Sequence, residues 1–166
     1  FIEDLKLLPV VAFDHLAEML NAVEAGAPWP QQTLLAKSAY LSKEPDRLTD
    51  PLGYRVLAIM SITYRVWAAT RLQQLGPWVD SWAASGMFAG VPDKGAEDAW
   101  YLTALQVEYG RVSGIPVVGA SVDVFKCFDQ TCRPHLYGQL YTSGFPRGVL
   151  RGYSAYQESL SFRNSL

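Results

Sequence analysis

The chain has 166 residues, of which 49% are hydrophobic and 18% are charged, and its formal net charge at pH 7 is −2. This length fits one domain or a piece of a larger one, and the low charged fraction excludes a long disordered chain. The 5 Trp, 9 Tyr and 7 Phe residues are enough for a core. We expect part of the remaining apolar surface to be covered by other protein chains.

Charge is distributed unevenly along the sequence. Residues 1–30 carry one Lys against five acids, whereas residues 131–166 carry four Arg against Glu158. The net charge of −2 argues against a nucleic-acid binder, because contact with phosphates favours a basic surface. The basic C-terminal region fits either phosphate contact or a solvated helix face. No transmembrane segment is predicted, because the most apolar helical stretch, Val56 to Ala69, contains Arg65 and is shorter than about 20 residues.

In the first half of the chain, hydrophobic periodicity predicts a helix from Pro9 to Glu24, a strand from Ala36 to Leu41 and a long helix from Tyr54 to Leu75. Ser42 to Gly53 is polar and holds two prolines, so it is predicted to be a loop. Gly26 suits the end of the first helix. The apolar side of that helix consists of Phe13, Leu16, Ala17, Leu20 and Val23.

The second half is predicted to begin with a short helix or loop near Trp78 to Ala84 and a Gly-rich loop over Ser85 to Lys94. A helix over Ala96 to Arg111 and a strand over Val117 to Val124 follow. Two further helices are predicted over Arg133 to Thr142 and Arg147 to Ser159. The Ala96 helix is expected to turn Trp100, Thr103, Ala104 and Val107 inward. The fold class is therefore α+β, with five or so helices and two or three strands.

Asp123 is the most informative acid. It follows the apolar run from Ile115 to Val122 and precedes Phe128 by five residues and Asp129 by six. This pattern is typical of a buried strand that delivers a carboxylate to the floor of an active site. Asp123 as a helix cap or loop acid is the alternative, and Asp129 is expected to cap the helix that begins near Thr131.

Cys127, Cys132 and His135 have a spacing that invites a metal interpretation. A structural zinc site needs four ligands, and the chain has no further Cys. We therefore expect two free, partly buried thiols in a reducing, intracellular compartment.

The order of several segments resembles reverse transcriptases of non-LTR, LINE-like retroelements. These segments are Ala39-Tyr-Leu-Ser-Lys43, Tyr54-Arg55, Gly86-Met-Phe88, Gly95-Ala-Glu-Asp-Ala99 and Ser121 to Asp129. Val56 stands where that family usually has proline, and Val91 to Lys94 occupy a place where it usually has arginine. The resemblance implies one partial domain over residues 1–166, with helix-rich fingers over 1–114 and the start of the palm over 115–166.

The resemblance also implies an RNA-directed DNA polymerase that transfers nucleotidyl groups with two Mg²⁺ ions, a nucleic-acid template–primer and deoxynucleoside triphosphates. Asp123 and the carbonyl of Val124 would be metal ligands, Phe128 would sense the sugar, and Lys43 and Arg55 would contact the triphosphate. The residues alone leave an alternative for each of these side chains. Phe128 as a core residue and Lys43 as a plain surface residue are two of them. For Arg55 the alternative is to anchor the start of a helix or to pair with Asp50.

The family's Gly-x-Pro-Gln-Gly segment and its aromatic-x-Asp-Asp hairpin are absent from residues 1–166. Because the hairpin supplies the other metal-binding acids, we expect this chain alone to be inactive. The alternative is a non-catalytic structural or interaction subunit of a larger assembly that retains the fold. A third possibility is a helix-rich chain unrelated to nucleotides.

Overall fold

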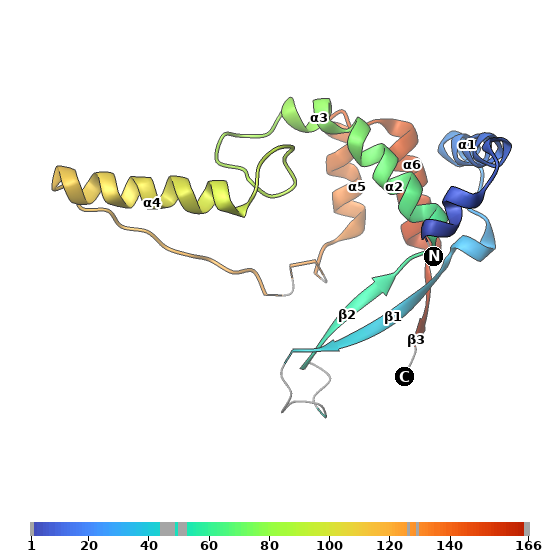
Figure 1. Cartoon of the computed structure of the whole chain (residues 1–166), viewed down its shortest axis with the longest axis horizontal. Helices are drawn as coiled ribbons and strands as arrows, with labels where there is room; N and C mark the ends of the chain where they lie inside the picture. The colour runs from blue at the N-terminus through green and yellow to red at the C-terminus, as the bar shows by residue number, and fades with distance from the viewer. Residues whose placement is uncertain (1, 44–48, 50–52, 126, 129, 165–166) are drawn as a thin grey trace. The chain divides into compact units, whose positions relative to one another are not determined.

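The computed structural model describes residues 2–43, 49, 53–125, 127–128 and 130–164. The described chain is a mixed α+β fold, as predicted, with six α-helices and one three-stranded sheet (Figure 1). It divides into two compact units. Unit 1 comprises residues 1–71 and 137–166, and unit 2 comprises residues 72–136.

Unit 1 holds the sheet and most of the helices. Its elements are the 3-10 helices η1 (Ile2–Leu7) and η2 (Gln31–Thr33), helix α1 (Val10–Ala25), strands β1 (Leu35–Ser42), β2 (Tyr54–Ile59) and β3 (Ser161–Asn164), helix α6 (Arg147–Ser159), and most of α2 (Ile62–Gln74) and α5 (Arg133–Thr142). Unit 2 contains α3 (Gly76–Asp80), α4 (Ala96–Ser113) and long irregular segments.

Four predicted helices are confirmed to within a residue or two at each end, the usual uncertainty of helix boundaries. They are α1, α4, α5 and α6. The first ends at Gly26, whose φ of 118° is in the left-handed region that favours glycine, and α4 ends in the same way at Gly114, with φ of 67°. The predicted strand at Ala36 to Leu41 is also confirmed, as β1.

The prediction of one long helix from Tyr54 to Leu75 is wrong over its first eight residues, 54–61. Residues 54–59 form β2, and α2 begins only at Ile62. Val56, Leu57 and Ile59 favour a strand once β1 is available to pair with them, and that pairing is not visible in a periodicity of three and four. Ser61 separates the two elements, and its Oγ accepts a hydrogen bond from the Tyr64 amide at 3.3 Å.

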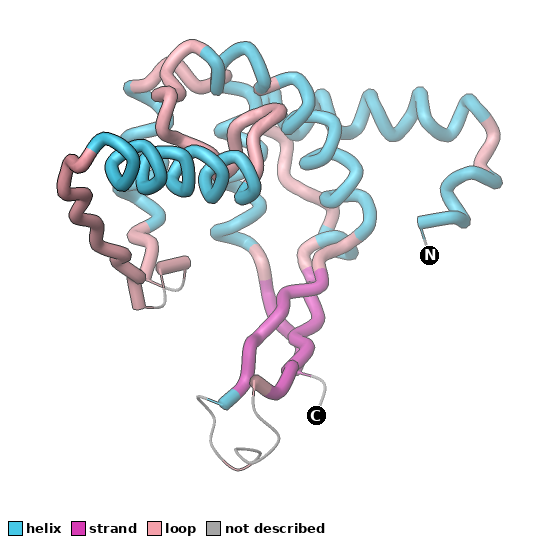
Figure 2. The backbone as a smooth tube through the Cα atoms, turned by 60° about the vertical axis from the view of Figure 1, so that its left-hand side comes forward, coloured by secondary structure: helices cyan, strands magenta, loops and turns pink. Residues whose placement is uncertain are grey.

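The sheet has the order β2-β1-β3, with β1 antiparallel to β2 and parallel to β3. Figure 2 shows the three strands running side by side. The register places Leu41 opposite Arg55 and Lys37 opposite Ile59 in the antiparallel pair, and Lys37 beside Arg163 in the parallel pair. The C-terminal strand is therefore joined to a segment that lies more than a hundred residues earlier.

An aromatic cluster forms the core of unit 1. Trp29 makes edge-to-face contacts with Tyr64, Trp67 and Tyr156 at centroid separations of 5.7, 5.4 and 5.2 Å, and Tyr64 stacks on Tyr156 at 3.6 Å. Leu20 and Val23 of α1 complete the buried set. The polar ends of the rings are also paired: Trp29 Nε1 donates to Gly152 O at 2.8 Å and Tyr156 Oη donates to Thr33 O at 3.0 Å.

Two expectations for unit 2 are corrected by the structure. The side of α4 predicted to face inward is exposed, with Trp100 72% and Val107 51% accessible. Residues 117–124 form no strand; the segment has no regular structure and its Val side chains are open to solvent. β-branched residues favour a strand only when a neighbouring strand satisfies their backbone groups, and the described residues provide none for this segment.

Candidate functional site

Lys43 and Arg55 lie at the same end of the β1–β2 hairpin. Arg55 is opposite Leu41 in the register, and the amide of Lys43 donates to the carbonyl of Gly53 at 2.8 Å, which continues the antiparallel ladder one pair beyond Ser42 and Tyr54. The turn between them includes residues outside the described part of the chain, among them Asp50, so the predicted Asp50 pairing of Arg55 also lies outside it.

The alternation of side chains along a strand places both cations on one face of the sheet. Lys43 is two residues beyond Leu41, and Leu41 shares its face with Arg55, so the two cations are diagonal neighbours. In an antiparallel pair such neighbours are about 7–8 Å apart at the backbone, within reach of long side chains. Both residues are exposed. They are therefore able to contact one anionic group together.

Asp123, Val124 and Phe128 lie in unit 2, in the segment without regular structure. All three side chains are exposed, and Phe128 is 94% accessible. The buried strand that was expected to hold Asp123 is absent, and the alternative of Phe128 as a core side chain is wrong for this structure. Asp129 lies outside the described residues, so its predicted cap on α5 is not described.

The residues present supply an incomplete donor set for Mg²⁺. Among the described residues, no three His, Cys, Asp or Glu side chains come close enough to hold a metal ion. One carboxylate from Asp123 and one carbonyl from Val124 fall short of the six oxygens that Mg²⁺ prefers. Cys127 and Cys132 are free and exposed, which corrects the expectation of partly buried thiols.

Two cations on the sheet were not singled out from the sequence. Lys37 belongs to β1 and lies beside Arg163 of β3, and both share the face of Lys43 and Arg55. The even spacing of six residues from Lys37 to Lys43 is visible in the sequence and is typical of one strand face. The place of Arg163 was not, because it depends on a parallel pairing between distant segments.

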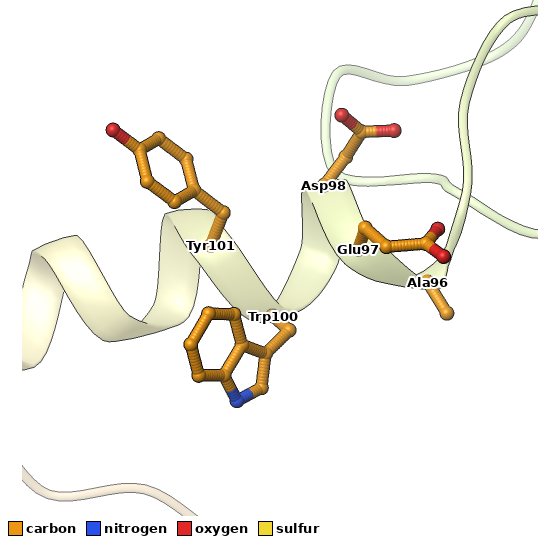
Figure 3. Close-up of a pocket in the computed structure, with 5 residues that line it drawn as sticks. All are labelled: Ala96, Glu97, Asp98, Trp100 and Tyr101. Atoms are coloured by element: carbon orange, nitrogen blue, oxygen red, sulfur yellow. The ribbon is translucent and has the colours of Figure 1, made fainter.

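One surface hollow of the described chain, of about 590 Å³ near η1 and the start of α2, is lined by Glu3, Asp4 and Arg65 together with apolar side chains. A groove of about 280 Å³ between α1 and α2 is lined by residues such as Phe13, Leu16 and Val66. A hollow of about 600 Å³ on the first turns of α4 is lined by Glu97, Asp98, Trp100 and Tyr101, with the two aromatic rings on opposite sides of the helix (Figure 3). Neither the groove nor the hollow on α4 has the polar arrangement of a small-molecule site.

No described helix combines the length and the apolar character that crossing a membrane requires. Comparison of the chain with protein-family models, with curated proteins and with solved structures gives no match in any of the three.

Proposed function

We propose that the chain is the fingers region and the start of the palm of an RNA-directed DNA polymerase that resembles the reverse transcriptases of non-LTR retroelements. One observation supports this proposal above the others. The β1–β2 hairpin carries Lys43 and Arg55 as exposed diagonal neighbours on one face, an arrangement that allows both side chains to contact one triphosphate.

The roles of the two cations differ in this proposal. Arg55 presents a planar fork that binds two phosphate oxygens at once, whereas Lys43 acts as a point charge. Deoxynucleoside triphosphate binding is the first function that we assign to the hairpin. Asp123 and the carbonyl of Val124 would hold part of the Mg²⁺ site, and Phe128 would sense the sugar; these three assignments come from the resemblance alone.

Residues 1–166 are expected to be inactive in nucleotidyl transfer. The two-metal reaction needs carboxylates on both ions, and the downstream Asp-Asp hairpin of the resembled family is missing from this sequence. An incorporation assay on a primed RNA template should show no extension by this chain alone. Extension that disappears in the Asp123→Ala variant would overturn the expectation.

Titration calorimetry with a deoxynucleoside triphosphate tests the hairpin contact. The Lys43→Gln/Arg55→Gln variant should bind at least about tenfold more weakly than the native chain, equivalent to about 1.4 kcal/mol. The matched control Lys6→Gln/Arg65→Gln removes the same charges from exposed positions outside the sheet. Native binding that is absent, or that falls equally in both variants, would contradict the proposal.

A second function is favoured by the apolar surface of unit 2. Trp100, Tyr109 and Val112 of α4 are each more than two-thirds exposed, and Val118 and Val122 are more exposed still. Exposed apolar area of this extent is typical of an interaction surface, which fits a non-catalytic subunit of a larger assembly. Sequencing the transcript beyond the codon for Leu166 distinguishes the two functions. A reading frame that continues into Gly-x-Pro-Gln-Gly and an Asp-Asp hairpin supports the polymerase. A stop codon supports the non-catalytic subunit.

A further inference from the structure

Helix α4 of unit 2 exposes almost all of its surface (Figure 1). Among its 18 residues, Ala96–Ser113, only Gly110 is buried. An isolated helix of this length is marginally stable in water, because most helical stability in proteins comes from packing an apolar side. We therefore expect another surface to cover one side of α4. Its apolar side chains are each about half exposed or more, and they are Trp100, Tyr101, Leu102, Leu105, Val107, Tyr109 and Val112.

One side of α4 carries an unbroken apolar stripe. Its residues follow one another at steps of three, four and three, and they are Leu102, Leu105, Tyr109 and Val112. This is the spacing of the core positions in a coiled coil, where side chains of two helices interleave along a shared line. We call these four residues the α4 seam. The seam is open to solvent, from 47% exposure at Leu102 to 78% at Val112.

The opposite side of α4 is less suited to helix packing. Trp100 and Val107 lie there, at the same kind of spacing. The positions between and after them are taken by Thr103 and Gly110, which offer little apolar surface. Gly110 is also covered already, because Val117 from the chain after α4 lies against it. The α4 seam is therefore the apolar side that remains for a partner.

We propose that the α4 seam packs antiparallel against the α4 seam of a second copy of this chain. Such a twofold pair uses the same surface on both copies. A twofold axis near the middle of the helix places Leu102 opposite Val112 of the second copy. The same axis places Leu105 opposite Tyr109 of the second copy, so that a large side chain meets a smaller one, as close packing requires.

Charge favours the antiparallel order over the parallel one. Asp98 lies four residues before Leu102, on the line of the seam. In a parallel pair the two Asp98 carboxylates would face each other and repel. The antiparallel order separates them to opposite ends, each beside the end of the other helix that carries Arg111, and it also opposes the two helix dipoles. The proposal rests on the interaction surface proposed for unit 2 and identifies its partner.

Sedimentation velocity of the full chain over a series of concentrations tests the pairing. The native chain should shift from monomer to dimer as its concentration rises, and Leu105→Glu should weaken this association by at least about tenfold. The matched control is Val107→Glu, because Val107 has a similar exposure, 51% against 48% for Leu105, and lies on the other side of α4. It should keep native association. Circular dichroism of both variants checks that the helix content is unchanged.

A charge exchange tests the direction of the pair. Leu102→Lys and Val112→Glu should each weaken association, and the variant that carries both should recover part of it. Recovery is expected because each new lysine then faces a new glutamate of the other copy, whereas a parallel pair would bring like charges together.

Three results would each overturn the proposal: a native chain that stays monomeric, equal weakening by Val107→Glu, or no recovery in the double variant. Sequencing of the transcript is a separate readout. A reading frame that continues into the polymerase motifs would refute the non-catalytic subunit and leave the sedimentation result unchanged. Triphosphate binding by the β1–β2 hairpin should be the same in Leu105→Glu as in the native chain.

Discussion

Glu24 and Trp67 connect the end of α1 to α2 inside unit 1. The indole Nε1 of Trp67 donates to Glu24 Oε1 at 2.6 Å, and Arg71 Nε donates to the same oxygen. The side chains of Glu24 and Arg71 are 16% and 22% exposed, so this is a largely buried ion pair. The backbone carbonyls of Glu24 and Ala25 accept from Arg151 of α6, which ties a third helix to the same point.

Replacing Glu24 should destabilise unit 1 strongly. Glu24→Ala leaves the Arg71 guanidinium and the Trp67 indole without their acceptor in a partly buried site, which costs about 2–4 kcal/mol. Urea unfolding followed by tryptophan fluorescence measures the change. The control is Glu18→Gln, which breaks an exposed pair with His15 and should change stability by less than about 0.5 kcal/mol. A Glu24→Ala effect as small as that of the control would refute the importance of this contact.

Tyr156 is expected to contribute through its hydroxyl as well as its ring. The side chain is fully buried and donates to Thr33 O at 3.0 Å. Tyr156→Phe keeps the stack on Tyr64 but leaves the carbonyl without this donor, at a cost of about 1–2 kcal/mol. Tyr156→Ala also removes the ring and should cost about 3–5 kcal/mol. Equal losses in the two variants, measured by urea unfolding, would be inconsistent with this division between ring and hydroxyl.

Alkaline pH should destabilise unit 1 through Tyr64. Burial raises the pKa of Tyr64 from 10.0 to about 12, and burial also raises the pKa of Tyr156. The folded state therefore holds the phenolic proton more tightly than the unfolded state. The stability that this provides is complete below about pH 10 and is lost as the pH rises toward about 12.

Urea midpoints measured from about pH 9 to about pH 12 test this expectation, because burial disfavours the charged phenolate. The Tyr64→Phe variant should lose less stability than the native chain over that interval. The control Tyr109→Phe removes an exposed phenol and should leave the native slope unchanged. A native and a Tyr64→Phe chain with the same pH dependence would rule out Tyr64 as the source.

Gly110 should resist substitution although it lies inside a helix. An added Cβ would meet Val117 Cγ2 at 2.2 Å and the Ile115 carbonyl at 3.0 Å. Gly110→Ala ordinarily stabilises an exposed helix by about 1 kcal/mol. Here it should instead weaken the hydrogen bond from the Ile115 amide to the Gly110 carbonyl, which is 2.9 Å long.

Amide hydrogen exchange at Ile115 measures that effect. Exchange should become faster in Gly110→Ala by on the order of tenfold, which corresponds to about 1.4 kcal/mol. The double variant Gly110→Ala/Val117→Ala removes the closest clash and should recover part of the protection. Slower exchange in the single variant would show that the chain after α4 does not pack against Gly110.

Local patterns predicted the elements whose stability is largely local. The first helix, with its terminal Gly26, and the helices at Arg133 and Arg147 follow from periodicity and from glycine and proline at their ends. Errors arose where pairing decides the outcome. Residues 54–59 became a strand because β1 pairs with them, and residues 117–124 did not because nothing described pairs with them.

In the candidate site, too, the residues in recognisable local segments were predicted, and the residue placed by long-range pairing was not. Lys43 and Arg55 were found from short segments, and the register then explained how they share a face. Arg163 was missed, because a residue near the end of the chain joins that face only through its parallel pairing with Lys37. Asp123 was predicted from an apolar run that suits a strand, yet such a run is equally compatible with an exposed, unpaired segment.

The parallel pairing of residues 35–38 with residues 161–164 also has a consequence for synthesis. During translation, the first half of unit 1 leaves the ribosome long before its closing strand does, and all of unit 2 emerges in between. Strand β1 therefore lacks its parallel partner until residues 161–164 have been synthesised. Completion of the sheet is therefore expected to be a late event, slower than formation of the helices, since distant segments have to meet first.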